Sequence, residues 1–375
     1  MNPAPRAAVV LFVFQRPGPT AAVLEVLRAV RPPVLYVVAD GPRPAHHGDS
    51  ERCRLTRQVV VEGIDWPCEQ HHLWSDANLG CDRSMIRGIS WVFEREEQVI
   101  VLEDDCIPEP TFFRFCDELL ERYRDDLRVT QVCGNNRLLR WKQDRQSYHF
   151  GYYGSAWGWA TWRRAWELFD PRMTGRGDRS LMSLIESRLG DADEYRAFLR
   201  VTDPGPSNPH DISWDYRWAF SQIAQGGLTA TAAVNLVRHV GFGPDSTHNH
   251  RRPLGAIAKS EPITFPLLAP AVVQRDAEFD HRHFVCGVGR PDADSAARFG
   301  QELIHAGRAI EALAVVHGVW QTHPGHRDIA LVRARALMAL NRPALAITLL
   351  DRLLAADPDD DEALCLRQVC GPHRA

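Results

Sequence analysis

The chain has 375 residues, of which 45% are apolar and 25% are charged, and its formal net charge is −4. These are ordinary values for a globular protein, and the small negative charge gives no electrostatic basis for binding nucleic acid or an anionic membrane. The longest early apolar run, 7–14, is far too short to span a bilayer. Nine cysteines without a CxxC pair favour reduced thiols over disulfides or a zinc site, which predicts a cytoplasmic protein.

The first third of the chain predicts strands that alternate with helices. Continuous apolar runs are typical of strands buried on both faces, and amphipathic runs are typical of helices that cover a sheet. The predicted strands are 8–14, 34–39, 69–74 and 98–102, and the predicted helices are 21–30, 82–95 and 111–123. This alternation predicts an α/β domain with a mainly parallel sheet, in which ligands bind at the carboxyl ends of the strands.

Acidic residues follow two of these strands. Asp40 follows the second strand, and Glu103, Asp104 and Asp105 end the fourth. Adjacent carboxylates repel one another, and a divalent cation is the usual compensation for such a cluster. Because strand side chains alternate, we expect Glu103 and Asp105 on one face and Asp104 on the other. The alternative is a solvated turn whose acids favour the N-terminus of the following helix.

The middle third is irregular and rich in aromatic residues. Trp162 and Trp166 are interpreted as buried, whereas Trp157 and Trp214 are candidates for a surface on which a sugar ring could stack. Residues 261–294 contain prolines and little periodicity, which indicates a wrap-around segment or a linker.

The last part of the chain repeats with a period of 34 residues. Pairs at this spacing are Pro324 and Pro358, Gly307 and Asn341, and Ala312 and Ala346. Each segment predicts two helices joined by a short turn, a pattern that resembles tetratricopeptide repeats, with an ordinary helical bundle as the alternative. We therefore predict two domains, 1–290 and 291–375, the first with a nucleotide-binding half of about 1–140 and an acceptor half of about 141–290.

Several catalytic motifs are absent from the sequence. It has no P-loop, no GxGxxG after a strand, no HExxH and no GxSxG, which argues against P-loop ATPases, classical dehydrogenases, zincin proteases and α/β-hydrolases. An acidic strand end and a distant Trp214-Asp215 pair suit transfer from a metal-bound diphosphate donor. In such a reaction the metal neutralises the leaving group and an acid takes a proton from the acceptor.

Seven segments of the first 250 residues together resemble GT-A-fold glycosyltransferases of the family 2-like and N-acetylglucosaminyltransferase I-like kind. They are Phe14-Gln15-Arg16-Pro17, Asp40-Gly41-Pro42, Asn78-Leu79-Gly80, 101–108, 154–159, Trp214-Asp215 and 235–243. The implied fold is a Rossmann-like GT-A domain with a mainly parallel sheet, followed here by a small all-α repeat region.

The resemblance also implies roles for the matching residues. Asp105 would hold Mn²⁺ or Mg²⁺, and His239 and His248 are further candidates for a metal or phosphate contact. Asp215 would be the base of an inverting transfer, with Asp211 as its rival. Donor binding is expected from Phe14, Arg16, Pro17, Asp40, Gly41, Arg83, Glu103 and Asp104, with Asp40 on the uracil ring, and acceptor binding from Trp157, Gly158 and Trp214. For Arg83 and the two histidines, a solvated surface position is the alternative.

The resulting hypothesis is a metal-dependent glycosyltransferase that moves a sugar from a UDP-sugar, with UDP-GlcNAc among the candidates, to a glycan, lipid-linked or protein acceptor. Without the membrane anchor and disulfides of the N-acetylglucosaminyltransferase I group, the chain resembles a bacterial relative, cytoplasmic or peripheral to the membrane. Two alternatives stay open. One is a catalytically silent nucleotide-sugar-binding scaffold that recruits a protein partner through its repeats. The other is a nucleotidyltransferase, which is disfavoured because residues 15–20 lack a glycine-rich basic loop.

Overall fold

The computed structural model describes residues 4–44, 46–203, 212–241, 259–284, 293–323 and 325–370. The chain divides into two compact units, which we call the sheet unit (Met1–Arg251 with Lys259–Ala277) and the helical unit (Arg252–Ala258 with Glu278–Ala375). The predicted domain boundary at residues 290 and 291 lies outside the described residues and stays a prediction.

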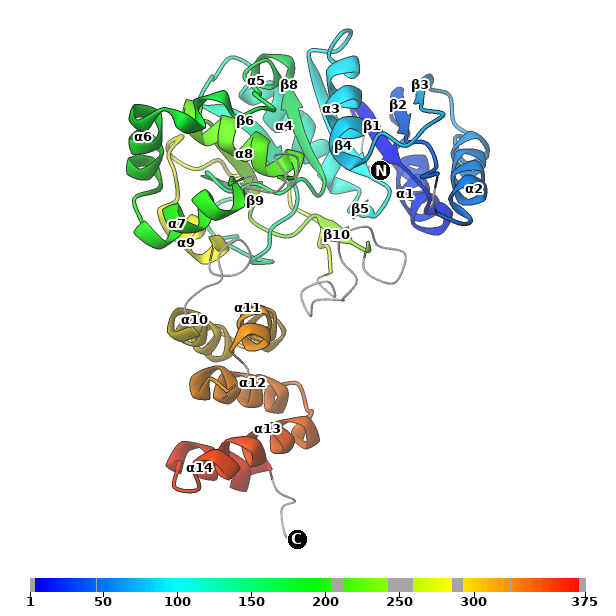
Figure 1. Ribbon diagram of the computed structural model, residues 1–375. Coiled ribbons are helices and arrows are strands. Elements are labelled where there is room, and N and C mark those ends of the chain that lie inside the picture. Colours follow the sequence, from blue (N-terminus) through cyan, green and yellow to red (C-terminus); the bar gives the residue numbers. More distant parts are fainter. Residues whose placement is uncertain are drawn as a thin grey trace. The chain divides into compact units, whose positions relative to one another are not determined.

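Among the described residues, the sheet unit contains an eight-stranded mixed sheet in the order β3-β2-β1-β4-β8-β6-β9-β7 (Figure 1). Neighbouring strands from β3 to β4 are parallel, as are β6 and β9, whereas β8 is antiparallel to both its neighbours and β7 is antiparallel to β9. The strands are β1 (Ala8–Val13), β2 (Val34–Ala39), β3 (Glu69–Trp74), β4 (Gln98–Glu103), β6 (Val129–Cys133), β7 (Tyr148–Gly151), β8 (Trp159–Trp162) and β9 (Leu228–Ala232). A second, small sheet pairs β5 (Cys106–Pro108) with β10 (Val237–His239).

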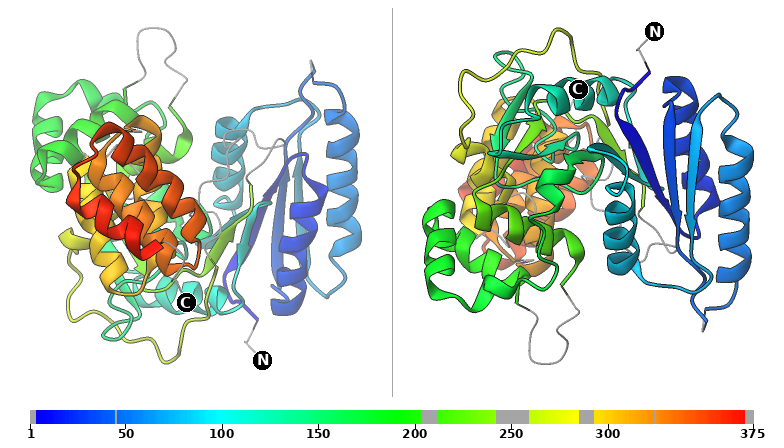
Figure 2. Two further views of the ribbon diagram at one scale, coloured as in Figure 1. Left: turned by 90° about the horizontal axis from the view of Figure 1, so that it is seen from below. Right: turned by 90° about the horizontal axis from the view of Figure 1, so that it is seen from above.

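Helices cover both faces of the large sheet, and Figure 2 shows α1 and α2 on one side of the N-terminal strands and α3 on the other. Val9 and Leu11 of β1 pack in the core formed with α1, α2 and α4, and the intervening Val10 and Phe12 pack with α3 and α8. Strand β1 is apolar throughout because both of its faces are buried. The helices are α1 (Pro17–Val30), α2 (Asp49–Gly63), α3 (Cys81–Val92), α4 (Thr111–Arg122), α5 (Arg163–Trp166), α6 (Arg179–Leu189), α7 (Ala192–Val201) and α8 (Trp214–Gln225), with a 3₁₀ turn at Thr174–Gly177.

The predicted α/β fold class is confirmed, and each strand predicted in the first third ends within one residue of its predicted boundary. Helix α1 begins at Pro17 rather than at residue 21, because proline is well suited to the first turn, where its missing N–H has no partner to lose. Helix α2 was not predicted. Its sequence is mostly polar and did not indicate that Asp49 is buried. In the structure Asp49 forms ion pairs with Arg43 and Arg52.

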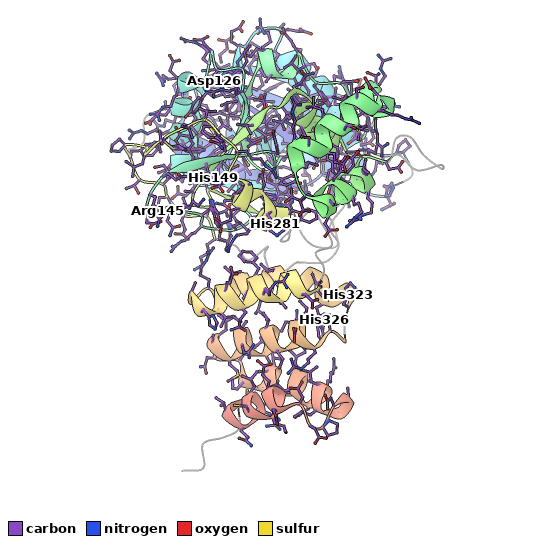
Figure 3. All side chains as sticks on the ribbon, turned by 90° about the vertical axis from the view of Figure 1, so that its left-hand side faces the viewer. Asp126, Arg145, His149, His281, His323 and His326 are labelled. Carbon is purple, nitrogen blue, oxygen red and sulfur yellow. The ribbon has the colours of Figure 1, made fainter. Side chains whose placement is uncertain are left out.

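The helical unit is a series of antiparallel helices that follows the predicted repeat. After α9 (Ala277–His283) come α10 (Ala293–His305), α11 (Ala309–Thr322), α12 (Arg327–Ala339), α13 (Pro343–Ala356) and α14 (Asp361–Cys370). Gly307 and Asn341, which the sequence paired, both adopt left-handed backbone angles (φ 73° and 57°) in the turns between helices. Ala312 and Ala346, the second pair, are both fully buried. The third pair involves Pro324, which lies outside the described residues; in Figure 3 the neighbouring His323 and His326 mark the turn between α11 and α12.

The eight cysteines among the described residues are free thiols. Within the same residues, none of the helices combines the length and the apolar character needed to cross a bilayer.

Candidate functional site

A cavity of about 350 Å³ lies at the carboxyl ends of β1, β2 and β4. Its wall is formed by the loops after these strands, the first turns of α3, and residues that flank β8 and β10. Of the residues predicted for the site, the wall contains Phe14, Arg16, Asp40, Glu103, Asp104, Asp105, Trp157 and His239. The structure therefore brings together residues that lie up to 225 positions apart in the sequence.

The acidic triplet does not alternate as predicted. Strand β4 ends at Glu103, and Asp104 and Asp105 form the turn that leads into β5. Both aspartates therefore face the same partner, Arg16, which follows β1. Its guanidinium donates one hydrogen bond to Asp104 Oδ1 and another to Asp105 Oδ2, the latter at 2.5 Å. The alternative of a solvated turn is wrong, because Asp104 and Asp105 are 1% and 6% exposed.

Asp105 lies where the two small strands meet. Pairing of β10 with β5 sets His239 opposite Cys106, and His239 Nε2 comes within 3.4 Å of Asp105 Oδ2. The Cys106 thiol lies 3.6 Å from the other oxygen of the same carboxylate. One ligand atom from each of Asp105, Cys106 and His239 falls within 4.8 Å of the others, so these side chains could hold a metal ion. A carboxylate suits Mn²⁺ or Mg²⁺, an imidazole is a common ligand of many transition metals, and a thiolate prefers softer metals.

Gly241 completes the surroundings of Asp105. A β-carbon at this position would lie 1.9 Å from Asp105 Oδ2 and 3.0 Å from Arg16 Nη1. The backbone N–H of Val240 donates to the carbonyl of Asp105 at 2.8 Å. The segment after β10 therefore packs directly on the acidic turn, and only glycine fits at its closest point.

Burial and neighbouring charges shift the pKa values of the three acids of the triplet in different directions. Burial, followed by the charges of Asp105 and Asp104, raises the pKa of the half-buried Glu103 well above its usual range. Burial also raises the pKa of Asp104 to about 6, although Arg16 opposes the shift. For Asp105 the effect of burial is outweighed by the hydrogen bond from His239 and the charge of Arg16, which hold its pKa below the usual range. Asp105 is thus the acid of the triplet that keeps its negative charge most firmly.

Asp40 has a partner set that the sequence did not suggest. Its carboxylate accepts hydrogen bonds from the backbone N–H groups of Gly41, Leu79 and Gly80 at 2.8–3.0 Å and from the Asn78 side-chain amide at 3.0 Å. Position 41 also accommodates only glycine, because a β-carbon there would lie 2.5 Å from the Ala77 backbone. Asp40 therefore anchors the loop that precedes α3. Contact with a uracil ring stays a prediction.

Trp157 lies between the cavity and the segment after β6. Its ring stacks on His239, with centroids 4.0 Å apart and an interplanar angle of 17°, and the Arg137 guanidinium lies 5.1 Å from its centroid. Stacking holds the imidazole in the orientation that points Nε2 at Asp105. Gly158 is buried and adopts a left-handed backbone angle (φ 72°) beside Val237. Acceptor contacts by Trp157 and Gly158 stay predictions.

The Trp214-Asp215 pair begins helix α8. Trp214 is 3% exposed and packs on Trp159, and its backbone N–H donates to Asp82 of α3. Trp214 is therefore a core residue, and contact with an acceptor stays a prediction. Asp215 does not cap the helix, because Ser213 holds the N-cap position. Within the described part of the chain, Asp215 Oδ1 is buried and has no hydrogen-bond partner.

Other predicted residues lie away from the cavity wall or outside the described residues. Arg83 is on the exposed face of α3, and Pro17 begins α1. Asp211 and His248 lie outside the described residues.

Several residues of the site were not singled out in the sequence: Gln15, Arg43 and Gly241, which line the cavity, and Cys106, which lies beside Asp105. Gln15, Cys106 and Gly241 stand inside segments that carried the family resemblance, and Arg43 directly follows another. Their positions in or next to those segments were what could have indicated from the sequence that they belong to the site. Their side-chain or backbone contacts could not be derived from the sequence.

A comparison with protein-family models finds a match within the helical unit. Residues 303–368 match the family model described as tetratricopeptide repeat. No curated protein sequence matches the chain.

Solved structures with some similarity include the mannosyltransferase PcManGT from Pyrobaculum calidifontis in complex with GDP-Man and Mn²⁺. It is 14% identical with a TM-score of 0.35, over 98% of this chain and 85% of that one. S. aureus TarS 1–349 is 8% identical with a TM-score of 0.36, over 96% and 90%. The inositol-1-phosphate CTP transferase from T. maritima is 12% identical with a TM-score of 0.34, over 71% and 99%. These structures are distant from the protein in both sequence and shape, whereas the repeat match identifies residues 303–368 as tetratricopeptide-like helices.

Proposed function

We propose that the sheet unit is a metal-dependent glycosyltransferase that moves a sugar from a UDP-sugar, with UDP-GlcNAc among the candidate donors, to an acceptor hydroxyl with inversion. The observation that supports the proposal most directly is the meeting of Asp105 and His239 at a cavity at the carboxyl ends of parallel strands. Carboxylate oxygens are preferred ligands of hard divalent cations, and a cation held in this way can in turn bind the phosphates of a diphosphate.

The cation would be Mn²⁺ or Mg²⁺, held by Asp105 and His239. When bound, it would supply positive charge that stabilises the diphosphate leaving group. Arg16 would add a second positive charge for the diphosphate, because a guanidinium can donate two parallel hydrogen bonds to phosphate oxygens. Glu103 and Asp104 would bind donor hydroxyls. The buried Cys106 thiol would support the Asp105 carboxylate, which it already contacts.

Asp215 is proposed as the general base that takes the acceptor proton. Asp215 is partly exposed, and its buried Oδ1 has no hydrogen-bond partner among the described residues, so no contact in this part of the chain commits the carboxylate to a structural role through that atom. Asp215 is in the first turn of α8, where the neighbouring Trp214 N–H donates to Asp82 of α3, and Cys81 next to Asp82 lines the cavity. Asp215 thus comes from an element that packs beside the cavity wall, in a different segment from Asp105, as is expected of the base and the metal ligand of an inverting displacement.

The test compares Asp105→Ala with the wild-type protein and with the matched control Asp125→Ala, whose carboxylate is 90% exposed. UDP binding is measured by calorimetry with and without Mn²⁺, and UDP release is measured with a panel of nucleotide sugars. We expect Mn²⁺-dependent UDP binding and UDP release for the wild type and the control, and loss of both in Asp105→Ala.

Two other outcomes would change the assignment. Undiminished Mn²⁺ dependence in Asp105→Ala would show that Asp105 is not the metal ligand. Tight UDP binding by the wild type without release of UDP from any nucleotide sugar would favour the alternative of a silent scaffold whose repeats recruit a protein partner.

A further inference from the structure

The buried pair Asp104 and Asp105 already holds a cation that belongs to the protein. Arg16 donates to one oxygen of each carboxylate, and the exposed fractions of the three side chains are 18%, 2% and 9% for Arg16, Asp104 and Asp105. Two carboxylates that are removed from water at this proximity can both stay ionised only if a positive charge lies between them. Arg16 therefore fulfils in this structure the electrostatic role that a bound metal would have.

Arg16 also limits access to the carboxylate oxygen that a metal would use. Asp105 Oδ2 lies 2.5 Å from Arg16 Nη1 and 3.4 Å from His239 Nε2, and the backbone of Gly241 closes a third side. His239 is the second proposed ligand and points at this same oxygen. A cation shared by Asp105 and His239 would have to share the space that the Arg16 guanidinium occupies.

We propose that Arg16 is a displaceable counter-cation, which keeps divalent metal from binding tightly until a nucleotide diphosphate arrives. This inference rests on the proposed function and adds an order of binding to it. The diphosphate carries negatively charged oxygens to which the guanidinium can turn. The two parallel N–H groups of an arginine match the oxygens of a phosphate as well as they match those of a carboxylate. Once Arg16 has turned to the diphosphate, Asp105 and His239 are free to bind the metal.

The proposal predicts that metal and nucleotide bind cooperatively. When the competent form is present only part of the time, the apparent dissociation constant rises by the inverse of that fraction. A site that Arg16 leaves open about a tenth of the time would thus bind metal about ten-fold more weakly than an open site. Because coupling between two ligands is reciprocal, UDP should tighten Mn²⁺ binding by the same factor as Mn²⁺ tightens UDP binding.

The experiment measures Mn²⁺ binding by calorimetry and by the electron paramagnetic resonance signal of free Mn²⁺, with and without UDP. Four proteins are compared: wild type, Arg16→Met, Arg16→Lys and the control Arg28→Gln, which removes an arginine on α1 that pairs with Glu25 and Asp65. We expect Arg16→Met to bind Mn²⁺ alone at least about ten-fold more tightly than the wild type, as its site is always open. UDP should then add little to its Mn²⁺ affinity. Arg16→Lys should be intermediate, because an ammonium group cannot bridge both carboxylates, and Arg28→Gln should match the wild type.

The possible results separate this inference from the proposed function. If Arg16→Met and Arg16→Lys bind Mn²⁺ alone no more tightly than the wild type, while the wild type binds UDP with Mn²⁺, the counter-cation proposal is wrong and the proposed function stands. If the wild type binds Mn²⁺ neither alone nor with UDP, both are wrong. If Arg16→Met does not fold without metal, a thermal unfolding transition that appears on addition of Mn²⁺ supports the proposal. If no such transition appears, the Mn²⁺ affinity of Arg16→Lys decides.

Discussion

Replacing Asp40 by asparagine tests whether this residue holds the cavity together. The substitution keeps the shape of the side chain but replaces one accepting oxygen by an NH₂ group, which then faces donors of residues 78–80. Leaving a buried donor without an acceptor costs about 1–3 kcal/mol. The backbone N–H groups of Leu79 and Gly80 and the Asn78 amide all depend on Asp40, but their loop is only partly buried. We therefore expect a total loss of about 2–4 kcal/mol, at the lower end of that cost for each donor.

For a domain of this size, 1 kcal/mol corresponds to roughly 2–4 °C in Tm, so Asp40→Asn should lower Tm by about 4–16 °C. The assay is thermal unfolding of the full chain, with Asp76→Asn as control because Asp76 is an exposed acid of the same loop. Calorimetry with UDP and GDP then separates the two roles of Asp40. A loop anchor predicts weaker binding of both nucleotides, whereas contact with uracil predicts loss of the preference for UDP. An unchanged Tm together with lost UDP preference would refute the anchoring role.

Three further predictions follow from the same structure. Gly241→Ala should abolish Mn²⁺-dependent UDP binding, because its β-carbon would collide with Asp105 Oδ2, while Gly18→Ala, which has nothing within 4 Å, should bind normally; equal binding by both variants would contradict the packing. Asp215→Asn should lower turnover by roughly 10²–10⁴-fold with nearly unchanged donor affinity, as expected for loss of a general base, and near-normal turnover would exclude Asp215 as the base. Burial lowers the pKa of His149 to about 3, so below about pH 6.5 the unfolded chain binds a proton that the folded chain does not, and stability falls as the pH falls. Between pH 7.5 and 5 this residue should account for about 2 kcal/mol of lost unfolding free energy, by linkage, so His149→Phe should show a correspondingly weaker pH dependence in urea titrations, and an equal dependence would refute the assignment.

The strands of the first third could be predicted because their signal is local. Strand β1 is buried on both faces and is therefore apolar at each position from Ala8 to Val13. Helix α2 gives a weaker signal, because its buried residues are Asp49, Cys53, Thr56 and Val60, and the two polar members disguise the apolar stripe. The 34-residue offsets in the helical unit are equally local, since each turn needs a residue such as Gly307 or Asn341 that tolerates a left-handed backbone.

The site was only partly predictable, because an acidic strand end suggests a metal without indicating what surrounds it. The rule of alternation placed Asp104 and Asp105 on opposite faces, but it applies only while the chain stays extended, and the strand ends at Glu103. Trp157 and Trp214 look alike in the sequence. In the structure Trp157 lines the cavity and Trp214 lies in the core.

The sequence by itself determined the α/β order of elements, the acids at the carboxyl ends of β2 and β4, and the repeat of the helical unit. Each of these is encoded within a few tens of residues by apolar periodicity or by spacing. Only the tertiary structure decided which distant groups meet at those acids. Arg16 reaches Asp104 and Asp105 because β1 and β4 are parallel neighbours, and His239 reaches Asp105 because β10 pairs with β5. Such contacts depend on strand pairing and register, which are set by the packing of the whole domain and not by the residues near each acid.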